Sequence, residues 1–353
     1  MGIKLHFHDK FAAIISGHGY CGMIQKLNMA TLLQSINQLI DNITVTDRQE
    51  ENIRQSLANI DGYLLDKENG LDIPRTFTNG SYERDTNIRP LDDIDMFAVL
   101  DFEKWKNEYG NYPNPQSVLS RIKNYLNDLN DYKDKVKQDR PCVTIELSNK
   151  SFDILPSFEQ FGGGYLIPNY DLKSWTYSYP EQLTKDLDDT HKLRNYKLKP
   201  TIKVIKYWNR ETGKLIPSYH IEEVAINIFK VNTFVNFEES VRLWFANAEY
   251  HMQSIKFKSN DDYNTALKRI KKVRDKLNDA KKKLDDGKES DALLIWKDVF
   301  GKEFPTVDIE EAKNLSKALT EGSLKIGSSG ALSTSVGTAI SASKGFFNGV
   351  SQE

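Results

Sequence analysis

The sequence has little cysteine and no long apolar run. Its 353 residues include only two cysteines, Cys21 and Cys142, and no Cys-x-x-Cys pair. Two thiols are too few for a disulfide framework, and a zinc site built on cysteine pairs is excluded. No apolar run approaches the ~20 residues that a membrane-spanning helix needs. The apolar piece 11–15 follows charged residues and is too short for a signal peptide. These absences predict a cytoplasmic protein without a membrane partner.

A net charge of one sign is also absent. The chain carries 48 Lys and Arg against 50 Asp and Glu, a formal charge of −2. Proteins that coat duplex nucleic acid carry a large basic excess, so that class is excluded, whereas a local basic groove is not. Hydrophobic residues make up 39% of the chain, which is enough for a packed core and rules out global disorder.

Length and local composition favour two domains and a tail within an α/β (α+β) fold. We predict a catalytic lobe with N-terminal helices over residues 1–165, a helical lobe over 166–315, and a flexible Ser/Gly-rich tail over 316–353. The Gly162–Gly164 run is a loop and a candidate domain joint. In the tail, Phe346 and Phe347 could form a small docking anchor, although a tail without function is an equally good interpretation.

Hydrophobic spacing predicts the main elements. Apolar residues three and four positions apart predict helices within 25–65 and over 117–129, 198–209, 221–234, 263–284 and 292–300. Thr46 and Gln49 have the spacing of a capping box. An apolar stretch at 94–100 and an alternating one at 142–148 predict strands, and the second forms a hairpin with 152–155. The charged residues within 263–284 are interpreted as a solvated face.

The strand at 94–100 opens on Asp-Ile-Asp. Side chains at i and i+2 of a strand face the same side, so Asp93 and Asp95 present two carboxylates while Ile94 faces the core. Adjacent carboxylates do not both stay ionised without a cation, and hard oxygen ligands suit Mg²⁺. Asp-x-Asp alone is a common pattern. Here the Gly80-Ser81 turn precedes it, and that turn offers a triphosphate close backbone approach, N–H groups and a hydroxyl.

A third carboxylate is expected on a neighbouring strand, and Asp153 is the candidate. It is the one acid within the apolar stretch 152–156, where a buried acid without a partner is costly. We therefore predict that Asp93, Asp95 and Asp153 hold two Mg²⁺ ions, or Mn²⁺, about 3.5–4 Å apart.

These residues resemble the DNA-polymerase-β-like nucleotidyltransferase superfamily. The fuller string over 80–95, Gly-Ser-Tyr-x-Arg-x-Thr-x-Ile-Arg-Pro-Leu-Asp-Asp-Ile-Asp, resembles the bacterial cGAS/DncV-like nucleotidyltransferases (CD-NTases). The resemblance implies a bilobed enzyme with a mixed-sheet lobe and a helical lobe. It also implies synthesis of cyclic di- or oligonucleotide second messengers from NTPs, ATP among them, in CBASS anti-phage defence. Asp153 would help to deprotonate the acceptor hydroxyl, and the product would activate a downstream effector protein.

A second block, residues 198–222, is similar to the matching segment of oligoadenylate synthases and cyclic GMP-AMP synthase. Its helical spacing makes one basic stripe of Lys199, Lys203, Lys206 and Arg210. Alone, such a stripe is typical of a solvated face, but the resemblance implies that Lys203 and Lys206 clamp the triphosphate. It further implies that Ser218 contacts the donor phosphates. Tyr219 matches a position whose ring stacks on the donor base, the alternative being a core or rim tyrosine.

Two departures from the family pattern matter. The six histidines, at 6, 8, 18, 191, 220 and 251, show no zinc-ligand spacing, so the zinc insertion of the animal DNA-sensing enzyme is missing and activation by duplex DNA is not expected. The ending Val350–Glu353 also differs from relatives whose terminal glycine is conjugated by a ligase partner.

Two other functions stay open at this point. A template-free RNA polymerase or tRNA nucleotidyltransferase would share the three acids, but such enzymes use an extended basic RNA surface that the composition does not show. A catalytically inactive nucleotide-binding regulator would share the fold, and the presence of all three acids counts against it.

Overall fold

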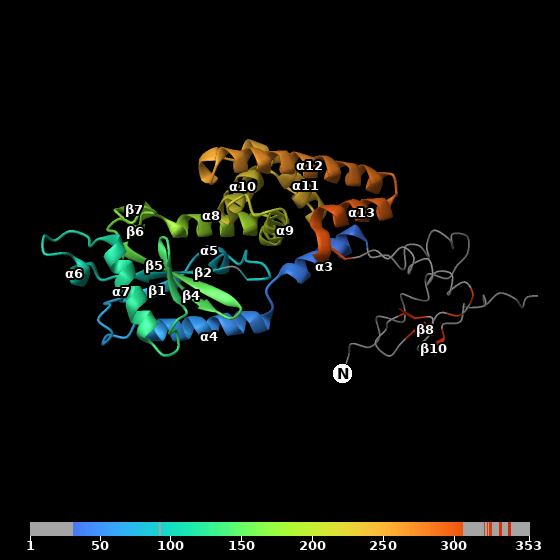
Figure 1. Cartoon of the computed structure of the whole chain (residues 1–353). Coiled ribbons are helices and arrows are strands. Elements are labelled where there is room, and N and C mark those ends of the chain that lie inside the picture. The colour runs from blue at the N-terminus through green and yellow to red at the C-terminus, as the bar shows by residue number, and fades with distance from the viewer. Residues whose placement is uncertain are drawn as a thin grey trace, which may run out of the picture. The chain divides into compact units, whose positions relative to one another are not determined.

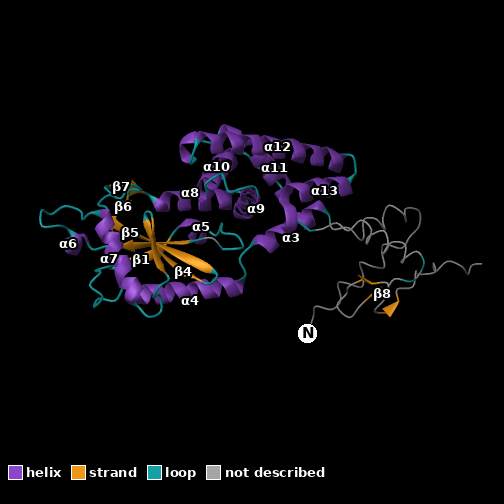
Figure 2. Cartoon of the chain, viewed as in Figure 1, coloured by secondary structure: helices purple, strands orange, loops and turns teal. Residues whose placement is uncertain are grey.

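The computed structural model describes residues 31–91 and 93–305, with short pieces between 321 and 339. Leu32–Pro305 form one compact unit that combines a mixed sheet with helices (Figures 1 and 2). The short pieces are three two-residue strands that pair antiparallel, β8 (Lys325–Ile326), β9 (Leu332–Ser333) and β10 (Thr338–Ala339). Cys21, the pair at 346–347 and most of the predicted tail lie outside the described residues.

The main sheet has seven strands and confirms the predicted α/β fold with a mixed sheet. Its central path runs, in order, through β1 (Arg75–Thr78), β2 (Ile94–Val99), β5 (Lys150–Glu159), β4 (Cys142–Leu147) and β3 (Val136–Asp139). β6 (Tyr165–Pro168) pairs with β5, and β7 (Trp175–Ser178) pairs with β6. β2 and β5 run parallel, whereas the other pairs are antiparallel. This parallel pair lies at the centre of the sheet.

The predicted hairpin over 142–155 is the β4–β5 pair, although β5 continues to Glu159. The Gly162–Gly164 loop is the turn from β5 into β6, and all three glycines have positive φ, which a turn of this kind requires. β6 and β7 therefore extend the same sheet beyond residue 165. The division into lobes at that residue stays a prediction.

The two faces of the sheet carry different side chains. Ile94, Met96 and Ala98 of β2 belong to a large buried cluster with residues of α4 (Asp47–Leu64) and α7 (Pro115–Asp128). The alternate positions, among them Phe97, face the other way. Thr46 and Gln49 form the predicted capping box at the start of α4. Because two helices cover one face, the odd-numbered positions of β2 remain available to a site on the opposite face.

The rest of the unit is helical. Its helices are α3 (Leu32–Ile43), α8 (Pro180–Leu193), α9 (Leu198–Glu211), α10 (Ser218–Val231), α11 (Phe237–Asn247), α12 (Asn260–Asp285) and α13 (Glu289–Phe300). Short turns complete it: α5 (Gly80–Glu83), α6 (Phe102–Trp105), η1 (Ala248–Tyr250), η2 (Ser254–Lys256) and η3 (Gly301–Glu303). α9 lies at the centre and contacts α3, α8, α10, α11 and α13. Among the described helices, none is long and apolar enough to cross a membrane.

The first described helix, α3, packs with helices that come late in the sequence of this unit. The Leu32 backbone N–H donates to Glu289 Oε1 at 2.9 Å, and Asn42 Nδ2 donates to the Glu303 carbonyl at 2.9 Å. α3 therefore belongs with α9, α11 and α13, whereas α4, the next helix along the chain, packs on the sheet.

Candidate active site

The parallel register of β2 and β5 places two of the predicted acids side by side. Asp95 of β2 is the register partner of Asp153 of β5. Both occupy odd-numbered positions, on the face opposite the cluster that contains Ile94 and Ile154. The predicted orientation of Ile94 toward the core is confirmed, since its side chain is buried in that cluster. The sheet topology thus brings together two carboxylates that are far apart in sequence.

Burial and like charge raise the pKa values of Asp95 and Asp153. The pKa of Asp95 rises from 3.8 to about 6, chiefly because burial disfavours the charged carboxylate and then because Asp153 adds like charge. Arg84 opposes the rise. Burial also raises the pKa of Asp153, although the Thr144 hydroxyl, which donates to Asp153 Oδ1 at 2.6 Å, works against it. Among the described residues, the Asp95 carboxylate accepts no side-chain hydrogen bond, so its charge lacks a close partner.

Asp93, the third predicted acid, is held differently. It precedes β2 directly, and its Oδ1 accepts a hydrogen bond from the Ser151 hydroxyl on β5. Within residues 31–91 and 93–305, no three Asp, Glu, His or Cys side chains are grouped closely enough to hold a metal ion as they stand. The structure therefore brings the three acids to one end of β2 and β5 without closing them around a common point. Their chemistry nevertheless fits a hard divalent cation, because Asp95 carries a destabilised charge and every donor is a carboxylate oxygen.

The Gly80-Ser81 turn is in direct contact with the acids. Gly80 has φ +71°, and a Cβ built there would lie 1.8 Å from Asp95 Oδ2. The turn is also tied to β2, because the Asn79 N–H donates to the Asp95 carbonyl at 2.9 Å. Only glycine allows both this backbone conformation and this approach. Ser81, the next residue, consequently lies beside the carboxylates.

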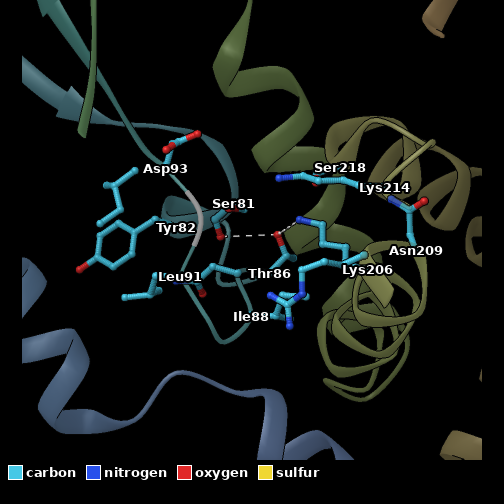
Figure 3. Close-up of a pocket in the computed structure, with 13 residues that line it drawn as sticks. Ser81, Tyr82, Thr86, Ile88, Leu91, Asp93, Lys206, Asn209, Lys214 and Ser218 are labelled. Carbon is cyan, nitrogen blue, oxygen red and sulfur yellow. Dashed lines mark hydrogen bonds between the residues drawn. The ribbon is translucent and has the colours of Figure 1, made fainter. Parts of the chain in front are cut away.

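A pocket next to this turn is lined by residues of both the sheet and the helices (Figure 3). Its wall includes the predicted site residues Ser81, Asp93, Lys206 and Ser218, and also Lys214. Ser218 is the first residue of the 14-residue helix α10, so its backbone N–H points out of the positive end of the helix dipole. A hydroxyl and a helix N-terminus across from Ser81 are suited to phosphate oxygens.

A buried ion network underlies the pocket. Glu222 of α10 is fully buried, and its Oε2 accepts from Arg84 Nε at 2.7 Å, while its Oε1 accepts from Lys206 Nζ at 2.6 Å and from the Thr86 hydroxyl. Figure 3 shows Thr86 between Lys206 and the Ser81 carbonyl. The two cations hold the pKa of Glu222 below its usual value. This network joins the segment after the Gly-Ser turn to α9 and α10.

The residues of this network belong to the two sequence blocks, 80–95 and 198–222. Arg84 and Thr86 follow Gly80-Ser81 in the first block, and Glu222 closes the second. Their side chains were not assigned a role, because nothing in the spacing shows that one carboxylate meets two cations 138 and 16 residues away.

The predicted basic stripe of α9 is not solvated. Lys203 Nζ donates to Asp85 Oδ1 at 2.7 Å, and Lys199 Nζ pairs with Asp188 at 2.9 Å. Arg210 donates to the carbonyls of residues 89 and 90. The Lys203 side chain is only 8% exposed, whereas that of Asp85 is 62% exposed. Spacing alone favours a solvated face, but Lys203 and Arg210 face the segment that follows the Gly-Ser turn and Lys199 faces α8. The role of Lys203 and Lys206 as triphosphate clamps stays a prediction.

Tyr219 lies at the surface rather than in the core. It is 41% exposed, and Lys256 Nζ stands 5.2 Å from the centroid of its ring. This excludes the alternative of a core tyrosine and leaves a ring with accessible area near the N-terminus of α10.

Comparisons with known proteins agree with this arrangement. Residues 29–190 match the model of the Second Messenger Oligonucleotide or Dinucleotide Synthetase domain. A probable cyclic nucleotide synthase of Bacillus cereus strain VD146 is 28% identical over 269 residues, covering 64% of this chain and 81% of that protein. The cyclic AMP-AMP-AMP synthase of an Acinetobacter species is 27% identical over 260 residues, covering 65% and 72%. E. coli MS115-1 CdnC, solved with ATP, has a TM-score of 0.62 at 14% identity, covering 78% of this chain and 99% of that one.

These comparisons support a nucleotidyltransferase that resembles the cGAS/DncV-like enzymes in sequence and fold. The resemblance drawn from the two sequence blocks is thereby confirmed, as is the polymerase-β-like CD-NTase fold. In this chain, Asp95 and Asp153 lie on the parallel strand pair, Asp93 directly precedes β2, and the Gly-Ser turn contacts Asp95. The cationic helix α9 and the start of α10 complete the surroundings.

Proposed function

We propose that this protein is a Mg²⁺-dependent synthase that joins NTPs, ATP among them, into a cyclic di- or oligonucleotide. The observation that carries the proposal is the contact of Gly80 with Asp95, which is paired in register with Asp153. A phosphate held by the Gly-Ser turn would lie directly beside two carboxylates, and nucleotidyl transfer needs that neighbourhood.

The chain's own residues would bind and orient the donor nucleotide. Ser81 and the N-terminus of α10, with Ser218, supply donors for the phosphates. Lys203 and Lys206 add positive charge to the same side of the site. Tyr219 supplies a flat surface for the base, a contact worth about 1–3 kcal/mol in other nucleotide-binding proteins.

Asp153 is the proposed acceptor of the proton from the attacking ribose hydroxyl. Its Oδ1 is occupied by the Thr144 hydroxyl at 2.6 Å, which fixes the carboxylate plane and leaves Oδ2 for the incoming proton. The Ser151 hydroxyl holds Asp93 Oδ1, and Asp93 Oδ2 would join Asp95 and Asp153 in holding the cations. Two Mg²⁺ ions, or Mn²⁺, bound by these acids would supply Lewis-acid stabilisation of the charge that develops on the phosphates.

The test is incubation with Mg²⁺ and the four NTPs, one of them labelled in each reaction, followed by phosphatase and a 3′–5′-specific nuclease. A product that resists phosphatase supports a ring, and the labels identify its bases. Addition of EDTA, or the Asp153→Asn change, should abolish the product. Growing linear products on an RNA primer would instead indicate a template-free polymerase, and ATP binding without pyrophosphate release would indicate an inactive regulator. Either result would contradict the proposed synthesis of a cyclic nucleotide.

We further propose that the enzyme acts in the bacterial cytoplasm in anti-phage defence, where its product activates an effector protein and duplex DNA is not the activator. The support for this proposal is the likeness of the chain to that family. A phage-challenged strain carrying the operon should lose protection when Asp95 is replaced by Asn. Unchanged plaque numbers would reject the defence role without affecting the enzymatic one.

A further inference from the structure

Residues 253–257, between α11 and α12, dock on the first turn of α10. The Gln253 N–H donates to His220 Nε2 at 3.1 Å, so His220 Nδ1 carries the ring proton and donates to Glu223 Oε2 at 2.9 Å. Glu223 Oε1 in turn accepts from Lys256 Nζ at 3.1 Å. The His220 ring also meets Phe257 edge-on at 6.0 Å. This chain of contacts fixes Lys256 beside the residues that open α10.

The same contacts place a cation on one face of an exposed aromatic ring. Lys256 Nζ lies 5.2 Å from the Tyr219 ring centroid, within the ~6 Å range of a cation–π contact. Tyr219 is 41% exposed, so much of the ring still faces solvent. A ring has two faces, and a cation on one of them leaves the other for a planar ligand.

We propose that Lys256 is a positioning residue for the donor nucleobase. It occupies one face of the Tyr219 ring and directs the base onto the opposite face. The ammonium also draws π-electron density toward itself, which lowers the repulsion between the ring and the electron-rich face of a purine. This inference rests on the proposed function of Tyr219 as the stacking surface. It makes the 253–257 segment, which neither sequence block includes, part of the nucleotide site.

The experiment is a double-mutant cycle on nucleotide binding. Binding of α,β-methylene ATP in the presence of Mg²⁺ is measured by calorimetry for the wild type, Lys256→Met, Tyr219→Ala and the double variant. We expect Lys256→Met to weaken binding about 3- to 10-fold, the size of a partly hydrated cation–π contact. In the Tyr219→Ala background the same change should have no further effect. Lys256→Arg should bind as the wild type does, and Lys258→Met, at an exposed lysine just after this segment, should change nothing.

Inorganic tripolyphosphate serves as a probe without a base. Its affinity should be the same for the wild type and Lys256→Met, because the proposed contact concerns the ring. The proposal would be overturned if Lys256→Met lost as much affinity for tripolyphosphate as for the ATP analogue, since Lys256 would then act on the phosphates. It would also be overturned if Lys256→Met lost as much affinity for the ATP analogue in the Tyr219→Ala background as in the wild type. Wild-type affinity of Lys256→Met for the ATP analogue would overturn it as well.

Kinetics separate this inference from the proposed function. Lys256→Met should raise KM for ATP and leave kcat unchanged, since the contact is made equally in the ground and transition states. A wild type that binds the ATP analogue but makes no cyclic product would defeat the proposed function alone. In that case the double-mutant cycle would still decide the role of Lys256.

Discussion

Gly80 and Asp95 approach so closely that a methyl group at position 80 would meet the Asp95 carboxylate at 1.8 Å. The contact joins the two sequence motifs that first pointed to the site, and it fixes where the Gly-Ser turn can lie relative to the acids. It also predicts that a residue with a Cβ at position 80 displaces the turn or the carboxylate.

Gly80→Ala is the direct test of this contact. The change forces an alanine into a backbone conformation that costs about 1–2 kcal/mol and pushes the turn away from Asp95. We expect turnover of NTPs to fall at least about 100-fold, since a displacement of about 1 Å at reacting groups has effects of that size. Gly110→Ala is the matched control: φ there is +74°, but nothing lies within 4 Å of the added Cβ. It should lose stability by a similar amount and keep its activity. Equal activity of the two variants would show that the approach to Asp95 is not important.

Asp95→Asn should make the metal-free protein more stable at neutral pH. The pKa of Asp95 is about 6 in the folded chain against 3.8 when unperturbed, so the folded state resists its ionisation. Because the pKa is raised in the folded state, Asp95 does not lower the free energy of unfolding below about pH 4. Its destabilising effect grows as the pH rises to about 6 and then stays constant. Allowing for water at the partly exposed carboxylate, we expect a gain of about 1–2 kcal/mol at pH 7.5.

Thermal unfolding in EDTA between pH 4 and pH 8 measures this. The difference in melting temperature between Asp95→Asn and the wild type should grow between pH 4 and 6. Glu108→Gln, at an exposed acid, should have the melting temperature of the wild type at every pH. A difference that is independent of pH would contradict the perturbed ionisation of Asp95.

Glu222→Gln should destabilise the fold strongly. It removes the carboxylate charge from the buried pairs with Arg84 and Lys206, and removal of one partner from a buried ion pair costs about 3–5 kcal/mol. Urea denaturation followed by circular dichroism gives the free energy of unfolding. Glu51→Gln, which breaks the exposed pair with Arg54, should cost no more than about 1 kcal/mol. If the two variants lose the same free energy, Glu222 does not neutralise the buried cations.

Much of the local structure could be predicted from the sequence, because period and caps act over short distances. The Thr46–Gln49 capping box and the strand that opens at Ile94 are examples. The pairing of Asp95 with Asp153 could be hypothesised only as a third acid on some neighbouring strand, since parallel register is set by packing across the whole sheet. The environment of the basic stripe on α9 is still harder to predict from the sequence. A lysine is interpreted as exposed until its partner is known, and the partners of Lys203 and Lys206 come from distant segments.

The ion pair of Lys203 with Asp85 has a consequence for how the enzyme would respond to nucleotide levels. One end is buried and the other stands largely in water, so Asp85 can swing away while Lys203 stays in place. Under the proposed function, the resting enzyme carries its own competitor for the triphosphate. A weak or singly charged anion would not dislodge it, whereas a triphosphate with a metal could. The pair would therefore raise the nucleotide concentration at which half of the enzyme is occupied.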